Sequence, residues 1–102
     1  MEGNATISGD VVARYAADAA SAVDGVRGLV ASQLHRHRGV RVAGGEAVAG
    51  ATIELHLDVE WGSSIPDVGR TVQRRVADYL ERMAGARPVA VNVIVDAIGP
   101  AR

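Results

Sequence analysis

The chain of 102 residues contains no cysteine. Its absence excludes disulfides, thiolate nucleophiles, zinc fingers and cysteine-ligated iron–sulfur clusters. Aromatic residues are scarce: Tyr15, Trp61 and Tyr79 are present and phenylalanine is absent. A hydrophobic core must therefore be built from valine, alanine, isoleucine and leucine. Valine favours strands and alanine favours helices, so the composition indicates a sheet covered by closely packed helices.

Lysine is also absent, and the eleven basic residues face twelve carboxylates, for a formal net charge of −1. This near balance argues against bulk electrostatic binding to nucleic acid or to anionic lipid. No apolar run approaches the ~20 residues that span a bilayer. The first ten residues, MEGNATISGD, lack the basic and then apolar order of a signal peptide. We therefore expect a cytoplasmic protein, which a protein partner would have to hold at any membrane.

A first amphipathic helix is predicted between Ser8 and Gly25. Ser8 suits the N-cap, and Gly25 is placed to end the helix in a left-handed conformation. Apolar residues recur every four positions between them, with small residues alongside. The predicted buried stripe consists of Val11, Val12, Tyr15, Ala16, Ala19, Ala20 and Val23.

A second helix is predicted within SSIPDVGRTVQRRVADYLERMAG, residues 63–85. Pro66 fits the first turn, Ser64 and Asp67 have capping-box spacing, and Gly85 supplies the stop. The apolar positions again follow helical spacing. The predicted buried stripe consists of Ile65, Val68, Val72, Val76, Leu80 and Met83.

Four strands are predicted, at residues 26–32, 39–44, 51–62 and 87–99. The third alternates most clearly, since Ile53, Leu55, Leu57 and Val59 share one face. Its other face carries Thr52, Glu54, His56, Asp58 and Glu60. In the last strand we expect odd-numbered valines 89–95 to point inward. Ala90, Asn92, Ile94 and Asp96 would point outward.

These elements predict an α+β fold in the order α-β-β-β-α-β. Residues 1–102 would form a single domain, with residues 1–7 as a short tail. The natural packing places both helices on one face of a mostly antiparallel sheet of three to four strands. The other face is then open, and Ala90 and Ile94 make it partly apolar. We expect this face or the sheet edges to support self-association.

Several motifs together resemble the alkaline shock protein family, or Gls family, of bacterial envelope-stress proteins. They are Trp61-Gly62, Ile65-Pro66, Gln73 with Val76, Met83 with Gly85, and Val91-Asn92-Val93. The resemblance extends from about residue 7 to 98. Trp61 stands where tyrosine is usual, Ala84-Gly85-Ala86 replaces a Thr-Gly-Leu, and the charged tails of many members are absent.

The resemblance implies a role in envelope stress and homeostasis, with no catalytic residues to carry over. It also implies self-assembly or assembly with related proteins, and it supplies no cofactor or small-molecule substrate. We interpret the motif residues as structural. They are Gly25, Trp61, Gly62, Ile65, Pro66, Gln73, Gly85 and Asn92.

The stretch HRHRGVRV, residues 35–42, raises the question of a metal site. His35 and His37 would share a strand face, and His56 or Asp58 could complete a ligand set. The favoured alternative is a solvated, charge-paired face. If Val42 pairs near Ile53, Arg41 falls opposite Glu54 and His37 falls opposite Asp58. This register predicts cross-strand ion pairs and no metal site.

No catalytic group is predicted. Glu54, Asp58 and Glu60 could be considered as acid catalysts, but strand alternation points them out of the sheet with no evident cleft. A raised carboxyl pKa needs burial. Neither a nucleophile elbow nor a His-Glu-x-x-His motif occurs.

The alternative function is RNA binding by a KH-like module. Residues 25–28, GVRG, fit the Gly-x-x-Gly pattern with which KH domains clamp a nucleic-acid backbone. In KH domains, however, that loop joins two helices, whereas here it joins a helix to a strand. Four arginines on the second predicted helix could contact phosphates, although acidic residues are interleaved with them. They are Arg70, Arg74, Arg75 and Arg82. A cysteine-free relative of iron–sulfur assembly domains has a similar element order but lacks ligands.

Overall fold

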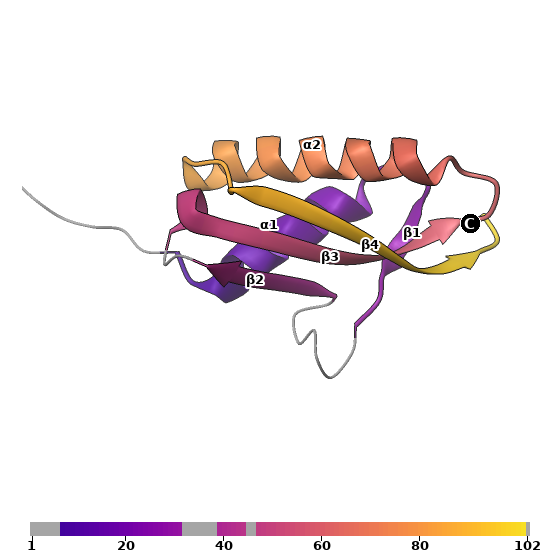
Figure 1. Ribbon diagram of the computed structural model, residues 1–102, viewed down its shortest axis with the longest axis horizontal. Coiled ribbons are helices and arrows are strands. Elements are labelled where there is room, and N and C mark those ends of the chain that lie inside the picture. The colour runs from indigo at the N-terminus through magenta and orange to yellow at the C-terminus, as the bar shows by residue number, and fades with distance from the viewer. Residues whose placement is uncertain (1–6, 32–38, 45–46, 102) are drawn as a thin grey trace, which may run out of the picture.

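The structure is a computed structural model that describes residues 7–31, 39–44 and 47–101. Its elements follow the predicted order, with one added turn of 3₁₀ helix (Figure 1). They are α1 (Gly9–Ser21), β1 (Val26–Leu29), β2 (Val40–Gly44), η1 (Val48–Gly50), β3 (Ala51–Glu60), α2 (Ile65–Ala84) and β4 (Ala90–Gly99). Of the expected N-terminal tail, residues 1–6 lie outside the described residues, and Ile7 packs against the core.

The sheet has β3 at its centre. β1 and β2 pair antiparallel with successive parts of one edge of β3, and β4 pairs parallel with the other edge. Two of the three pairings are therefore antiparallel, as predicted. A parallel pair needs a crossover connection, which α2 provides between β3 and β4. The predicted pairs Val42–Ile53 and Arg41–Glu54 are confirmed, whereas the predicted partner of Asp58, His37, lies outside the described residues.

Helix boundaries follow the predicted caps, with one exception. The side chains of Ser8 and Ser64 accept from the N–H groups of Val11 and Asp67, and Gly85 ends α2 with φ +80°. The assignment of Gly25 as the end of α1 is wrong, because the helix ends at Ser21 and Ala22 caps it. Gly25 instead lies in the turn before β1 with φ +93°, where a Cβ would approach the Val68 side chain to 2.9 Å.

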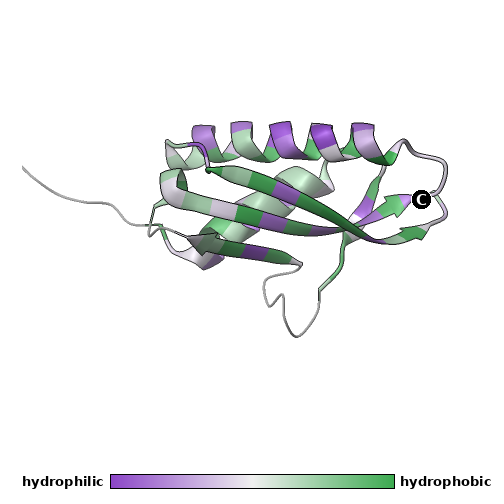
Figure 2. Ribbon diagram, viewed as in Figure 1, coloured by the Kyte–Doolittle hydropathy of each residue, from purple (hydrophilic) through white to green (hydrophobic). Residues whose placement is uncertain are grey.

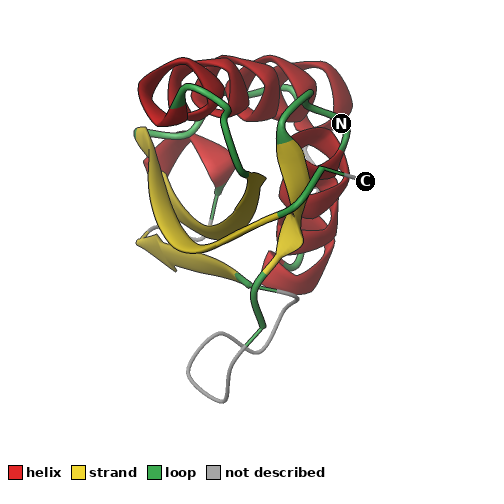
Figure 3. Ribbon diagram, turned by 90° about the vertical axis from the view of Figure 1, so that its right-hand side faces the viewer, coloured by secondary structure: helices red, strands yellow, loops and turns green. Residues whose placement is uncertain are grey.

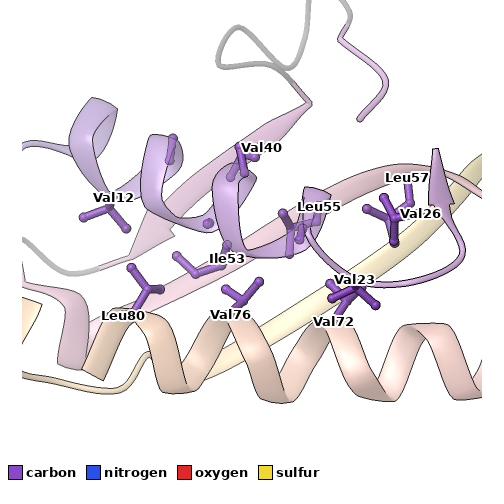
Figure 4. Packing of buried hydrophobic residues seen from close by; sticks show 14 of the residues in the cluster. Val12, Val23, Val26, Val40, Ile53, Leu55, Leu57, Val72, Val76 and Leu80 are labelled. Carbon is purple, nitrogen blue, oxygen red and sulfur yellow. The ribbon is translucent and has the colours of Figure 1, made fainter. Parts of the chain in front are cut away.

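The core lies between the helices and one face of the sheet (Figures 3 and 4). From β3 it receives Ile53, Leu55, Leu57 and Val59, all with no exposed surface. α2 contributes Val68, Val72, Val76 and Leu80, and α1 contributes Val12, Ala13, Ala16, Ala17 and Ala20. Because the buried face of α1 is mostly alanine, the helix can approach the sheet and α2 closely.

Four residues predicted to be inward are more exposed than expected. Val11 is 39% exposed, because the buried face of α1 is rotated toward Ala13 and Ala17. Ile65 and Met83 are exposed because they lie in the first and last turns of α2. Val89 is 69% exposed and precedes β4. The predicted stripes were therefore correct in the middle of α2 and wrong at its ends.

Candidate interaction surface

The open face of the sheet is the surface that no described helix covers. Figure 1 shows it toward the viewer, with α1 behind the sheet and α2 along one side. Polar and apolar residues alternate along β3 and β4 in Figure 2. We call the outward side chains of these strands, together with their contacts, the open face. They are Thr52, Glu54, His56 and Asp58 from β3, and Ala90, Asn92, Ile94 and Asp96 from β4.

His56 is the central residue of the open face. Its ring Nδ1 lies 2.6 Å from Oδ2 of Asp96, and its Nε2 lies 3.2 Å from Oε2 of Glu54. The residue is only 7% exposed, and it is the buried polar residue of the part of the chain that the structure describes. The expectation that His56 is a solvated strand residue is therefore wrong. Glu54 and Asp96 flank the ring, and Ile94 stands opposite it in the ladder.

This arrangement favours the imidazolium form of His56. Burial disfavours the charge, but hydrogen bonds from the ring to Glu54 and Asp96, and their negative charges, outweigh it. The pKa of His56 is consequently raised above its ordinary value. When protonated, the ring donates through both nitrogens and links β3 to β4 across the open face.

A second polar contact joins β1 to β3. Nη1 of Arg27 donates to both carboxylate oxygens of Asp58, at 2.9 and 3.1 Å. Both side chains are about two-thirds or more buried, which reduces the screening by water. The sequence paired Asp58 with His37, so the Arg27–Asp58 contact is a partner that the sequence did not predict. A cross-strand pair with an arginine instead of a histidine keeps its charge at any physiological pH.

The open face offers little for metal or acid–base chemistry. Within residues 7–31, 39–44 and 47–101, no group of three or more histidine or carboxylate side chains is placed to hold a metal ion. His35 and His37, the other members of the considered ligand set, lie outside the described residues. Both nitrogens of His56 already face carboxylates, which leaves no lone pair directed at a ligand.

A groove on the opposite side of the molecule lies between α1 and α2. It encloses about 480 Å³ and is lined by Asp18, Ala19, Ala22, Arg75, Asp78, Tyr79 and Arg82. Tyr79 forms an edge-to-face contact with Tyr15, and the Arg82 guanidinium lies 5.2 Å from the centre of the Tyr79 ring. Both charge signs line this groove, so it selects no ligand charge.

Most motif residues have structural positions. Gly62 and Gly85 adopt positive φ in the turns at either end of α2, and Pro66 lies in its first turn. The Nε2 of Gln73 donates to the carbonyl oxygen of Val91 in β4, at 3.1 Å. This agrees with the prediction that Gln73 satisfies backbone near the core.

Two motif residues point outward instead. Asn92 is exposed on the open face, next to Glu54 in the parallel ladder. Trp61 follows β3, is 79% exposed, and contributes its N–H to the carbonyl oxygen of Gly99. An exposed tryptophan has no stabilising role in the core, so both residues are available for contact with another molecule.

The features considered for RNA binding do not come together. Gly25 and Gly28 lie in the turn before β1 and within β1, and this segment joins no pair of helices. On α2, Arg70 is paired with Asp67. Arg87, after the helix, is paired with Asp78 and Glu81. Much of the positive charge near α2 is thus locally neutralised.

Comparisons with known proteins agree with this fold. Residues 1–100 match the model of the alkaline shock protein 23 family, which is described as having a cell envelope-related function. No curated protein sequence matches the chain. No described helix combines the length and apolar character that crossing a membrane requires.

Solved structures of the MamM CTD share the fold. One variant is 18% identical, covers 86% of this chain and 93% of its own, and has a TM-score of 0.63. A cadmium form is 20% identical, with 85% and 94% coverage and a TM-score of 0.62. A nickel form is 18% identical, with 86% and 96% coverage and a TM-score of 0.63. At these identities the similarity is one of fold alone.

Proposed function

Because the chain belongs to the alkaline shock protein 23 family, whose function is cell envelope-related, we propose that it is a non-enzymatic scaffold module that assembles with copies of itself or with related proteins. The resemblance to the alkaline shock and Gls proteins, seen in the sequence motifs, is thereby confirmed. The module would lie in the cytoplasm, and a membrane-anchored protein partner would bring it to the envelope. No cofactor or small-molecule substrate is part of this proposal.

The observation that carries the proposal is the construction of the open face. Its charged groups are engaged with one another, as the contacts of Arg27 with Asp58 and of His56 with Asp96 show. A carboxylate that is already paired is a poor general base, whereas a flat, neutralised surface can be covered by another protein at low desolvation cost. Ile94 adds an apolar centre that is 36% exposed.

Sedimentation velocity over a concentration series tests the proposal. We expect the sedimentation coefficient to rise with protein concentration as oligomers form. A strict monomer at tens of micromolar would reject self-assembly.

RNA binding is tested separately with a labelled single-stranded RNA at low and high salt. A KH-like clamp predicts micromolar binding with a steep salt dependence that is lost in Arg70→Ala/Arg74→Ala. The proposed scaffold role predicts no such binding.

A further inference from the structure

The outer edge of β4 has backbone groups that no described strand uses. In the part of the chain that the structure describes, β4 pairs with β3 and with no other strand. It is ten residues long, the same length as the central strand β3. A long edge strand is a template for pairing with another chain unless charge, proline or a covering element blocks it.

The direction of each backbone group follows from the ladder. The N–H of His56 donates to Gly39, and its C=O accepts from Val30, so even-numbered residues of β3 face β1 and β2. Odd-numbered residues of β3 therefore face β4, since neighbouring residues alternate. With Ile53 in register with Val91, this places the N–H and C=O groups of Val91, Val93 and Val95 on the outer edge.

Part of this edge is already covered. Gln73 of α2 donates to the carbonyl oxygen of Val91, which is the outward direction that the ladder requires. β4 starts beside α2 and then runs away from it toward the C-terminal end, as Figures 1 and 3 both show. The uncovered part of the edge is consequently centred on Val93 and Val95.

We propose that β4 pairs antiparallel with β4 of a second copy of this chain, around a two-fold axis at Ile94, so that two four-stranded sheets become one. This inference rests on the proposed self-assembly and names the surface that carries it. The second copy is the occupant because a two-fold axis makes the surface complementary to itself.

Side chains on the open face favour the register centred on Ile94. It places Ile94 against Ile94 of the second copy, and Asn92 against its Asp96. An apolar residue then meets its like, and an amide donor meets a carboxylate. The two Asp96 carboxylates stand well apart, on opposite sides of the axis.

Backbone bonding favours the same register. Val93 of one copy forms a hydrogen-bonded pair with Val95 of the other, and the reverse pair forms as well. The register centred on Val93 would instead use Val91, whose carbonyl already accepts from Gln73, and it would set Asn92 against Ile94. After Asp96 a bulge shifts the pairing of β4 with β3, so the edge is regular only up to this point.

Single cysteines test the register, because the natural chain contains none. The pair at the axis is non-hydrogen-bonded, with Cα atoms about 4.5 Å apart, within the range of disulfides. On mild oxidation we expect Ile94→Cys to give a covalent dimer. Asn92→Cys and Asp96→Cys should each stay unlinked alone, and should cross-link when the two proteins are mixed.

Proline at the edge tests the backbone bonds. In Val93→Pro the lost N–H points outward, so the bonds between β3 and β4 remain, and we expect loss of the dimer. Val93→Ala is the matched control and should retain the dimer. Circular dichroism shows whether each variant is folded, and the cysteine experiment decides the question if Val93→Pro does not fold.

The outcomes separate this inference from the proposed function. A natural chain that is monomeric at every concentration overturns both. A natural chain that self-associates, while Ile94→Cys fails to cross-link and folded Val93→Pro still associates, overturns the β4 interface alone. Growth into long polymers without the Ile94 cross-link would indicate head-to-tail pairing and would also overturn it.

Discussion

The Nδ1 atom of His56 lies 2.6 Å from Oδ2 of Asp96, although the two residues are 40 positions apart in the chain. His56 belongs to β3 and Asp96 to β4, and α2 separates these strands in the sequence. Glu54 approaches the other ring nitrogen. The only histidine among the described residues thus connects two parallel strands, and its charge state should affect how firmly β4 is held.

Stability should therefore depend on pH through His56. Its folded pKa is raised above the ordinary value of 6.5, so the folded chain keeps the proton over a range in which the unfolded chain loses it. The contribution is fully present below pH 6.5 and is lost as the pH rises through the raised folded pKa. Urea unfolding at a series of pH values should show this decline in the natural chain. The decline should be weaker in His56→Gln, and parallel curves for the two proteins would contradict the role of His56.

Two glycines of the second helical region should respond oppositely to the same substitution. Gly69 lies inside α2 with no atom near the position of a Cβ, whereas Gly85 ends the helix with φ +80°. Gly69→Ala should stabilise by about 0.5–1 kcal/mol, because alanine restricts the unfolded chain and favours helix. Gly85→Ala should destabilise by about 1 kcal/mol, because a Cβ strains the left-handed conformation. Thermal unfolding of the two variants measures both, and equal signs would contradict the assignment of the helix end.

Truncation of Leu55 should test the alternation of β3. The side chain has no exposed surface and lies at the centre of the core (Figure 4). Leu55→Ala should lower the free energy of unfolding by about 2–5 kcal/mol through lost burial and a residual cavity. Val89→Ala is the matched control, since Val89 is 69% exposed, and its effect should stay within about 0.5 kcal/mol. Similar effects in the two variants would argue against the inward face of β3.

The contact between Gln73 and Val91 should contribute a small stabilisation. Gln73→Ala removes the donor to the edge carbonyl, at a cost of about 0.5–1.5 kcal/mol. Arg74→Ala is the neighbouring control, because no partner of Arg74 among the described residues is lost. Chemical denaturation compares the two. A larger loss for Arg74→Ala would show that Gln73 does not anchor β4 to α2.

The local parts of this fold were predictable from the sequence. The helix caps at Ser8, Ser64 and Gly85 depend on backbone groups within a few residues, so the residue types alone indicated them. The alternation from Ile53 to Val59 fixed which face of β3 is buried. The pairing of Arg41 with Glu54 followed from matching the apolar face of β2 to that of β3.

The open face was decided by tertiary structure. Alternation places His56 and Asp96 on the same side of the sheet, but only the parallel pairing of β3 with β4 brings them into contact. Arg27 reaches Asp58 because β1 follows β2 along the same edge of β3, and no sequence period encodes that placement. The rotation that exposes Val11 depends on what α1 packs against. Periodicity specifies which side chains avoid water, whereas the partners of polar groups depend on contacts between segments distant in the chain.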